Sequence, residues 1–113
     1  MKCFKNALVY VAGEGVKKCT VEFDETIRAI GGDSSAEQIV LPEGAIVLPG
    51  FIDQHIHGAG GADGMDATIA DYETIAKTVA AEGTTSFVIT TMTQSVENIT
   101  KAMQAVKEYR EGE

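Results

Sequence analysis

The segment over residues 47–66 constrains the fold of this chain more than any other. It reads VLPGFIDQHIHGAGGADGMD, an apolar strand-like run that ends in Asp-x-His-x-His and continues into a glycine-rich turn. Alternate side chains of a strand share one face, so Asp53, His55 and His57 are expected to point the same way. Two imidazoles and a carboxylate at one strand end can therefore converge on a single cation.

His55 and His57 are the candidate metal ligands, because neutral imidazole is the commonest metal ligand in proteins. They are the two histidines of the chain, and both fall in this segment. Asp53 is the candidate carboxylate behind them, since a carboxylate that accepts from a ligating histidine fixes its tautomer. The glycines that follow allow the backbone to approach a ligand closely. The alternative interpretation is that both are ordinary strand-end histidines.

The pattern before residue 49 indicates a small β-sheet. Short runs with strand-like composition alternate with glycine-containing turns. We expect these strands to pair antiparallel and to serve a structural purpose. The predicted strands cover residues 2–11, 19–23, 26–30, 39–41 and 45–48.

The pattern after residue 49 indicates strands that alternate with helices. Thr68 is the expected N-cap of a first helix, with Asp71 three residues on. Its apolar residues recur at helical spacing, at Tyr72, Ile75, Ala76, Val79 and Ala80. Gly83 follows as a residue that can take a positive φ after the helix.

A second strand and a second helix complete the pattern. Residues 84–91 are rich in β-branched residues, as in a strand buried on both sides. Ser95 is the expected N-cap of the second helix, whose predicted buried stripe is Val96, Ile99, Met103 and Val106. A strand, helix, strand and helix at this spacing predict a βαβα unit with a right-handed crossover.

Residues 49–66 resemble the first barrel strand of the amidohydrolase superfamily, and most closely that of N-acetylglucosamine-6-phosphate deacetylases. Pro-Gly-Phe-Ile-Asp-x-His-x-His is similar to the superfamily at large, which includes dihydroorotases and hydantoinases, whereas the continuation over residues 58–66 is the narrower match. Residues 82–91, EGTTSFVITT, resemble the second strand of the deacetylases. The resemblance runs over the whole chain and is looser before residue 45.

This resemblance implies an α/β fold in two parts. Residues 1–48 would be a small antiparallel sheet that is part of a β-sandwich, and residues 49–113 the first two βα units of a TIM-type (β/α)8 barrel. Such a barrel takes roughly 250 residues, whereas this chain has 113. The resemblance therefore implies the N-terminal portion of a longer enzyme.

The implied activity is hydrolysis of N-acetylglucosamine 6-phosphate to glucosamine 6-phosphate and acetate. The implied cofactor is a divalent metal, zinc first, with iron or another divalent ion as the alternative. A metal at His55 and His57 would lower the pKa of a bound water and polarise a carbonyl. A catalytic zinc site typically has three protein ligands, so the chain offers an incomplete site. No catalytic residue is assigned, and the isolated chain is expected to be inactive.

Other interpretations of the same residues stay open. The superfamily motif also permits an amidohydrolase that acts on a cyclic amide or imide, and the length permits a non-catalytic stand-alone remnant. Asp63 and Asp66 are either substitute ligands in an assembled oligomer or, more simply, turn and cap residues. Thr90 either borders the substrate or packs at the end of its strand.

Composition limits the partners. The chain has 17 acidic and 9 basic residues, a net charge of −8, which argues against nucleic acid or an anionic membrane as a partner. We expect a small amino-sugar phosphate as substrate. The sequence contains no secretory signal and no run of ~20 apolar residues. We expect a cytoplasmic protein in which Cys3 and Cys19 are free thiols. A disulfide between them across a hairpin is the alternative. Uncovered strand edges predict a homo-oligomer.

Overall fold

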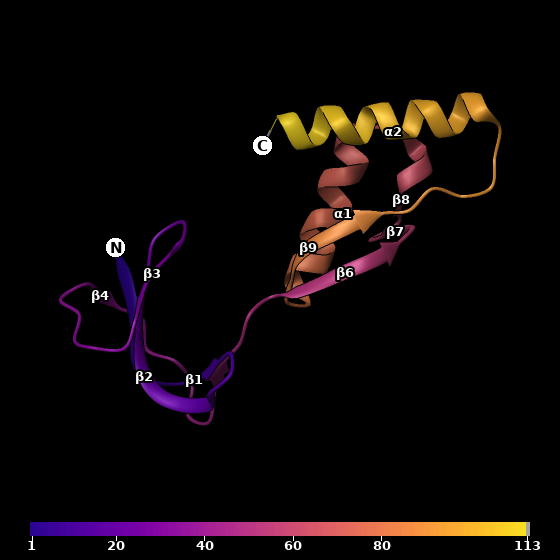
Figure 1. Ribbon diagram of the computed structural model, residues 1–113. Coiled ribbons are helices and arrows are strands. Elements are labelled where there is room, and N and C mark those ends of the chain that lie inside the picture. The colour runs from indigo at the N-terminus through magenta and orange to yellow at the C-terminus, as the bar shows by residue number, and fades with distance from the viewer. Residues whose placement is uncertain (113) are drawn as a thin grey trace. The chain divides into compact units, whose positions relative to one another are not determined.

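The computed structural model describes residues 1–112 as a mixed α/β chain (Figure 1). By contacts the chain divides into two compact units, Met1–Pro49 and Gly50–Glu113. The first contains β1 (Lys2–Val11), β2 (Gly15–Phe23), β3 (Ile27–Ile30), β4 (Glu37–Gln38) and β5 (Ile46–Val47). The second contains β6 (Phe51–Ile56), β7 (Gly58–Ala59), β8 (Ala62–Asp63), the 3-10 helix η1 (Gly64–Asp66), α1 (Ile69–Ala81), β9 (Thr84–Ile89) and α2 (Val96–Glu111).

The first unit is a five-stranded sheet in the order β3-β2-β1-β4, with β5 also paired to β1. The pairs β1–β2 and β2–β3 are antiparallel, as predicted. β4 and β5 instead run parallel to β1, so the prediction of an all-antiparallel sheet was wrong. Gly31 and Gly32, with φ of 92° and 72°, lie in the connection after β3. After this connection the chain runs parallel to β1. β4 pairs with Lys2 and Cys3 of β1, and β5 pairs with Leu8 and Val9.

The placement of the short strands also differs from the prediction. β4 covers Glu37–Gln38, whereas the sequence pattern placed a strand at residues 39–41. The prediction followed the apolar residues at 39–41. The residues that pair in β4 are a glutamate and a glutamine, and neither type is enriched in strands.

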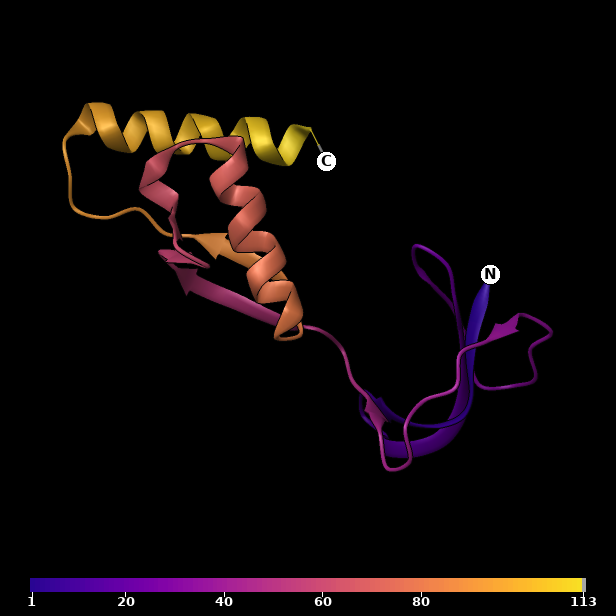
Figure 2. The ribbon, with the colours of Figure 1, turned by 180° about the vertical axis from the view of Figure 1, so that it is seen from behind.

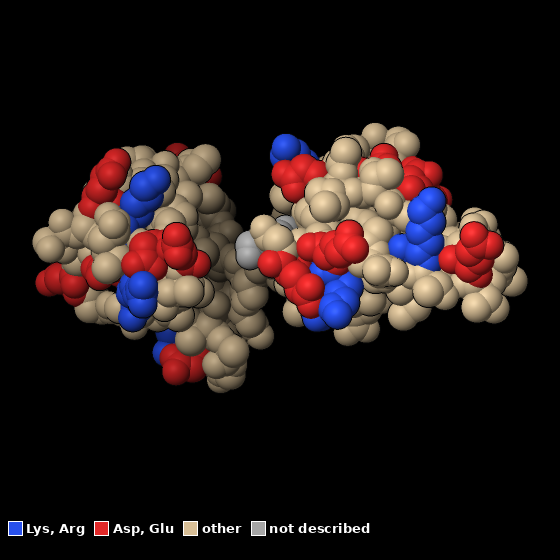
Figure 3. Space-filling model, turned by 90° about the horizontal axis from the view of Figure 1, so that it is seen from above, with Lys and Arg blue, Asp and Glu red and all other residues tan. Residues whose placement is uncertain are grey.

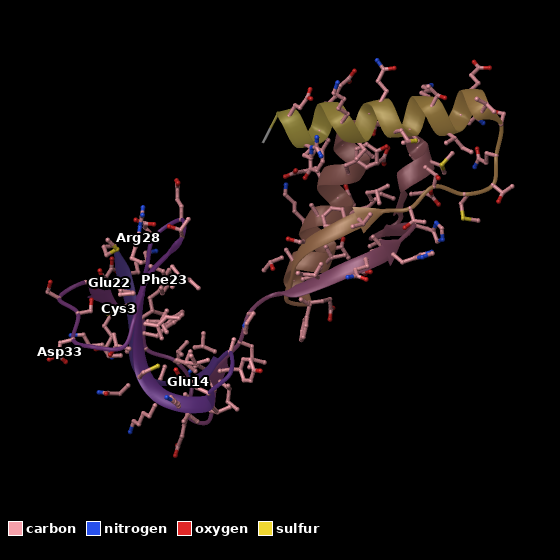
Figure 4. All side chains as sticks on the ribbon, viewed as in Figure 1. Cys3, Glu14, Glu22, Phe23, Arg28 and Asp33 are labelled. Carbon is pink, nitrogen blue, oxygen red and sulfur yellow. The ribbon has the colours of Figure 1, made fainter. Side chains whose placement is uncertain are left out.

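Cys3 and Cys19 are free thiols. Cys3 is buried on β1 and donates to the carbonyl of Ala36 over 3.4 Å (Figure 4). The register pairs Cys3 with Glu22 and Cys19 with Ala7, so the two cysteines do not face each other across the hairpin. The possibility of a disulfide that the sequence left open is therefore not realised.

The second unit is built on a parallel pair of strands joined through a helix. β6 pairs with β9, and α1 connects them. α1 covers one face of this pair, behind it in Figure 1 and in front of it in Figure 2. The helix begins at the predicted cap, because the Thr68 side chain accepts from the main-chain N–H of Asp71. Gly83 follows the helix with a φ of 90°, as expected.

The core of this unit lies under α1. Tyr72, Ile75 and Val79 are buried together with Ala62 of β8, as their helical spacing predicted for the three α1 residues. Half-buried apolar residues of β6, β9 and α2 pack against them, at Ile56, Phe87, Ile89, Ala105, Val106 and Tyr109. The helix is therefore held between the strands on one side and α2 on the other.

Two burial predictions for this unit were wrong. On α2, Ala102 is fully buried, whereas Val96 and Met103 are 82% and 63% exposed. The small side chain of Ala102 lets α2 approach the hydroxyl of Tyr72, and the face that carries Met103 turns away. β9 is covered on one face only, because Phe87 and Ile89 pack under α1 while Val88 is exposed.

Neither helix among the described residues combines the length and hydropathy of a membrane span. Self-association of the chain stays a prediction.

We expect Ile75→Ala to lower the free energy of unfolding of the second unit by about 2–5 kcal/mol, because it removes a fully buried side chain and leaves a cavity. Ile75 is 0% exposed. Ile69→Ala is the matched control on the same helix, since Ile69 is 55% exposed, and we expect it to change stability by less than about 0.5 kcal/mol. Urea denaturation followed by circular dichroism measures both, and equal effects would contradict the packing.

Candidate metal site

His55 and His57 meet where β6 ends. Their Nε2 atoms lie 3.2 Å apart, and their rings are 5.0 Å apart and nearly perpendicular. His55 lies on β6 and is exposed, whereas His57 directly follows the strand and is half-buried. The structure thus brings the two predicted ligands together, through the nitrogen atoms farthest from the backbone.

Thr90, which directly follows β9, holds the half-buried imidazole. Its carbonyl lies 2.9 Å from His57 Nδ1, and its main-chain N–H donates to the carbonyl of Ile56 over 2.8 Å. A carbonyl can only accept, so Nδ1 of His57 carries a proton and Nε2 of the neutral ring does not. His55 Nε2–H then donates to His57 Nε2, which assigns a tautomer to each ring.

Asp53 acts on the main chain of the motif. Its Oδ1 accepts from the backbone N–H of His55 over 3.1 Å. The register between β6 and β9 shifts between Asp53 and Ile56, so the strict alternation assumed from the sequence is interrupted there. A carboxylate that holds the amide of His55 fixes the backbone at this irregularity.

A small hairpin follows the histidines directly. β7 and β8 pair across Gly60 and Gly61, whose φ values of 63° and 86° form the turn; two positive φ values are those of a type I′ hairpin. A Cβ on Gly58 would lie 2.1 Å from the carbonyl oxygen of Ala62. The glycines therefore serve the close approach of two backbone segments within the protein.

The two loop carboxylates are cap residues. Asp63 is the N-cap of η1 and accepts from the N–H of Met65 over 2.8 Å. Asp66 accepts in return from the N–H of Asp63 over 2.9 Å, which completes a capping box. This confirms the simpler of the two interpretations made from the sequence.

Gly64 links this loop to the histidine and to the core. Its N–H donates to the carbonyl of His57 over 2.7 Å, and its own carbonyl accepts from the Tyr72 hydroxyl over 2.9 Å. The same hydroxyl lies 3.1 Å from the carbonyl of Ala102 on α2. Burial raises the pKa of Tyr72, with the carboxylates of Asp71 and Asp66 acting in the same direction, so the hydroxyl stays a donor.

The spacing of the two imidazoles fits a divalent metal, but the described residues supply an incomplete ligand set. Two nitrogens bound at about 2.0–2.1 Å to one tetrahedral zinc lie roughly 3.3 Å apart, close to the 3.2 Å observed. In the tautomers assigned above, Nε2 of His57 carries no proton, whereas His55 would have to give up its Nε2 proton, which also ends the contact between the two rings. Within residues 1–112, no group of three or more His, Cys, Asp or Glu side chains is arranged to hold a metal ion. The described residues thus supply two ligand positions.

The sequence interpretation missed the contributions of the Thr90 main chain, Gly64 and Tyr72. Main-chain groups leave no mark in residue type, so only the strand register reveals Thr90. Ile56 pairs with Ile89, and the same register continued by one residue places Thr90 beside His57.

No family model matches the chain. In sequence it is 41% identical over 78 residues to the N-acetylglucosamine-6-phosphate deacetylase of Bacillus subtilis, covering 69% of this chain and 20% of the relative. It is 36% identical over 115 residues to the N-acetylglucosamine-6-phosphate deacetylase of Vibrio furnissii, covering 97% of this chain and 29% of the relative. The chain matches the N-terminal portion of the N-acetylglucosamine-6-phosphate deacetylases.

The fold agrees with this family. The crystal structure of N-acetylglucosamine-6-phosphate deacetylase from Pasteurella multocida superposes with a TM-score of 0.77 and 26% identity, over 96% of this chain and 30% of that one. The chain thus spans less than a third of the length of each of these deacetylases. The resemblance to the deacetylase family stated from the sequence is confirmed.

Proposed function

We propose that this chain forms the N-terminal part of a metal-dependent deacetylase that hydrolyses N-acetylglucosamine 6-phosphate to glucosamine 6-phosphate and acetate. The observation that carries the proposal is the 3.2 Å pair of imidazole nitrogens at the end of β6, in a chain that resembles deacetylases of this specificity. In barrel enzymes, the C-terminal ends of the strands carry the active site. β6 and β9 are proposed as the first two strands of such a barrel, and the first unit as part of a β-sandwich.

His55 and His57 are proposed as two ligands of a divalent metal, with zinc expected first and iron as the alternative. When bound, such a metal polarises the substrate carbonyl and activates water for attack. His57 presents Nε2 because Thr90 holds the proton on Nδ1. Asp53 supports the metal site by holding the His55 amide. The third ligand, the acid/base group and the phosphate contacts are proposed to come from outside the described residues.

The acidic charge of the chain indicates that the phosphate of the proposed substrate binds to another part of the enzyme. On the face drawn in Figure 3, acidic side chains lie among basic ones, and the net charge is −8. A sugar phosphate is an anion, so its binding would need basic side chains or backbone amides from another part of the protein.

The test is metal removal from the complete protein that contains this sequence. We expect acetate release from N-acetylglucosamine 6-phosphate to stop after dialysis against a chelator and to return when zinc or iron is added. The double variant His55→Ala/His57→Ala should stay inactive under both conditions, whereas Gln54→Ala, on the same strand, should behave as the wild type. Hydrolysis of cyclic amides such as dihydroorotate, with no acetate release from the amino sugar, would overturn the proposed substrate.

A further inference from the structure

Tyr72 is a buried polar residue whose contacts lead to the candidate metal site. It is fully buried in the core of the second unit, yet its hydroxyl is directed at two main-chain carbonyls, those of Gly64 at 2.9 Å and Ala102 at 3.1 Å. A hydroxyl has one hydrogen to donate, so the two carbonyls share it. Packing alone would be served as well by phenylalanine, which raises the question of what the hydroxyl does.

The first of these contacts continues to His57. Gly64 accepts from Tyr72 with its carbonyl and donates with its N–H to the carbonyl of His57 over 2.7 Å. Gly64 also packs closely against the Ile89 side chain of β9, because a Cβ at this position would lie 2.7 Å from Cγ2 of Ile89. Gly64 is therefore bonded to Tyr72 and packed against β9.

The imidazole of His57 depends on this placement. Its Nδ1 reaches the carbonyl of Thr90, on the strand side, over 2.9 Å, whereas its main-chain carbonyl is held from the loop side by Gly64. The first contact orients the ring, and the second fixes the main chain that carries it. A hydrogen bond weakens steeply once its geometry is lost, so a shift of this main chain would weaken the contact of Nδ1 with Thr90.

We propose that Tyr72 is a positioning residue for His57. It acts through Gly64 to keep the imidazole bonded to Thr90 in the tautomer that leaves Nε2 unprotonated. This inference rests on the proposed metal site and names a group that supports it from the core. Tyr72 also connects α2 to the candidate metal site, because its hydroxyl donates to the carbonyl of Ala102 as well.

The tautomer can be read without metal, by nuclear magnetic resonance of the 113-residue chain with ¹⁵N-labelled histidine. We expect His57 of the wild type to be protonated mainly on Nδ1. In Tyr72→Phe the ratio of the Nε2-protonated to the Nδ1-protonated form should rise about fivefold, which corresponds to the loss of one hydrogen bond of about 1 kcal/mol. An unchanged ratio in a folded Tyr72→Phe chain would overturn the proposal.

Ile75→Val is the matched control, because Ile75 is also fully buried in the same core and its loss of one methylene destabilises the unit without removing a hydrogen-bonding group. It should leave the His57 tautomer unchanged, and an equal shift in this variant would show that any weakening of the core suffices. Should Tyr72→Phe fail to fold, hydrogen exchange of the Gly64 amide in the wild type decides. Exchange as slow as in the core of α1 supports the link, and exchange at the rate of an unstructured amide overturns it.

A zinc titration of the wild type separates this inference from the proposed function. Zinc binding together with an unchanged tautomer in Tyr72→Phe would remove Tyr72 from the site and leave the metal proposal standing. Absence of zinc binding with the expected tautomer shift would leave Tyr72 as a positioning residue for a histidine that binds no metal.

Discussion

Replacing His57 by alanine is expected to weaken zinc binding by the 113-residue chain by about 10–100-fold or more. Removing a residue that only orients a metal-binding side chain typically lowers metal affinity by about 10–100-fold. Removing a metal-binding side chain itself should lower the affinity by at least as much. The two Nε2 atoms lie 3.2 Å apart, so they can bind one ion together, and the remaining imidazole of His55 would bind it alone. Isothermal titration calorimetry measures the difference.

Gln54→Ala is the control for this prediction, because Gln54 lies between Asp53 and His55 on β6 and is exposed. It should bind zinc as the wild type does. The wild-type affinity itself is expected to be weak, since a catalytic zinc site typically has three protein ligands. Equal affinity of the wild type and His57→Ala would mean that zinc binds elsewhere, and the metal assignment would fall.

Gly58→Ala is expected to destabilise the second unit by about 3 kcal/mol or more, the upper range for side chains forced into a packed site. The added Cβ would lie 2.1 Å from the carbonyl oxygen of Ala62 and 2.9 Å from Cα of Asp63. Both are main-chain atoms of β8, so the hairpin has to open to accept the methyl group. Urea denaturation followed by circular dichroism gives the change in free energy of unfolding.

Gly112→Ala provides the comparison, because a Cβ there meets nothing closer than 3.4 Å, the distance to the carbonyl oxygen of Glu108. This variant should unfold within about 0.5 kcal/mol of the wild type. Since Gly58 directly follows His57, Gly58→Ala should also reduce zinc binding. A variant as stable as Gly112→Ala would contradict the hairpin geometry at Gly58.

The helices of the second unit were the most predictable part of the chain. Thr68 and Ser95 cap α1 and α2 as expected, and Tyr72, Ile75 and Val79 form the buried face of α1. A cap depends on contacts within one turn, and a helical face depends on a period of 3.6 residues. On α2 the same reasoning chose a stripe containing Met103, because the sequence cannot show that the small Ala102 allows the closest approach.

The candidate site was predictable only in its side chains. His55 and His57 were identified from their spacing at a strand end, and the structure brings their Nε2 atoms together. The strict alternation that placed Asp53 beside them does not hold, because the register of β6 shifts after Asp53.

Side chains close together along the chain were enough to predict the resemblance to the deacetylases, the two capped helices and the histidine pair. The tertiary structure decided that β4 and β5 run parallel to β1, that α2 approaches at Ala102, and that Thr90 and Gly64 hold His57. The physical reason is that these features depend on close packing and on hydrogen bonds to main-chain groups, whose partners meet only in the folded chain. Every residue except proline carries the same N–H and C=O groups, so residue type leaves the choice of partner open, and only the packed fold selects it.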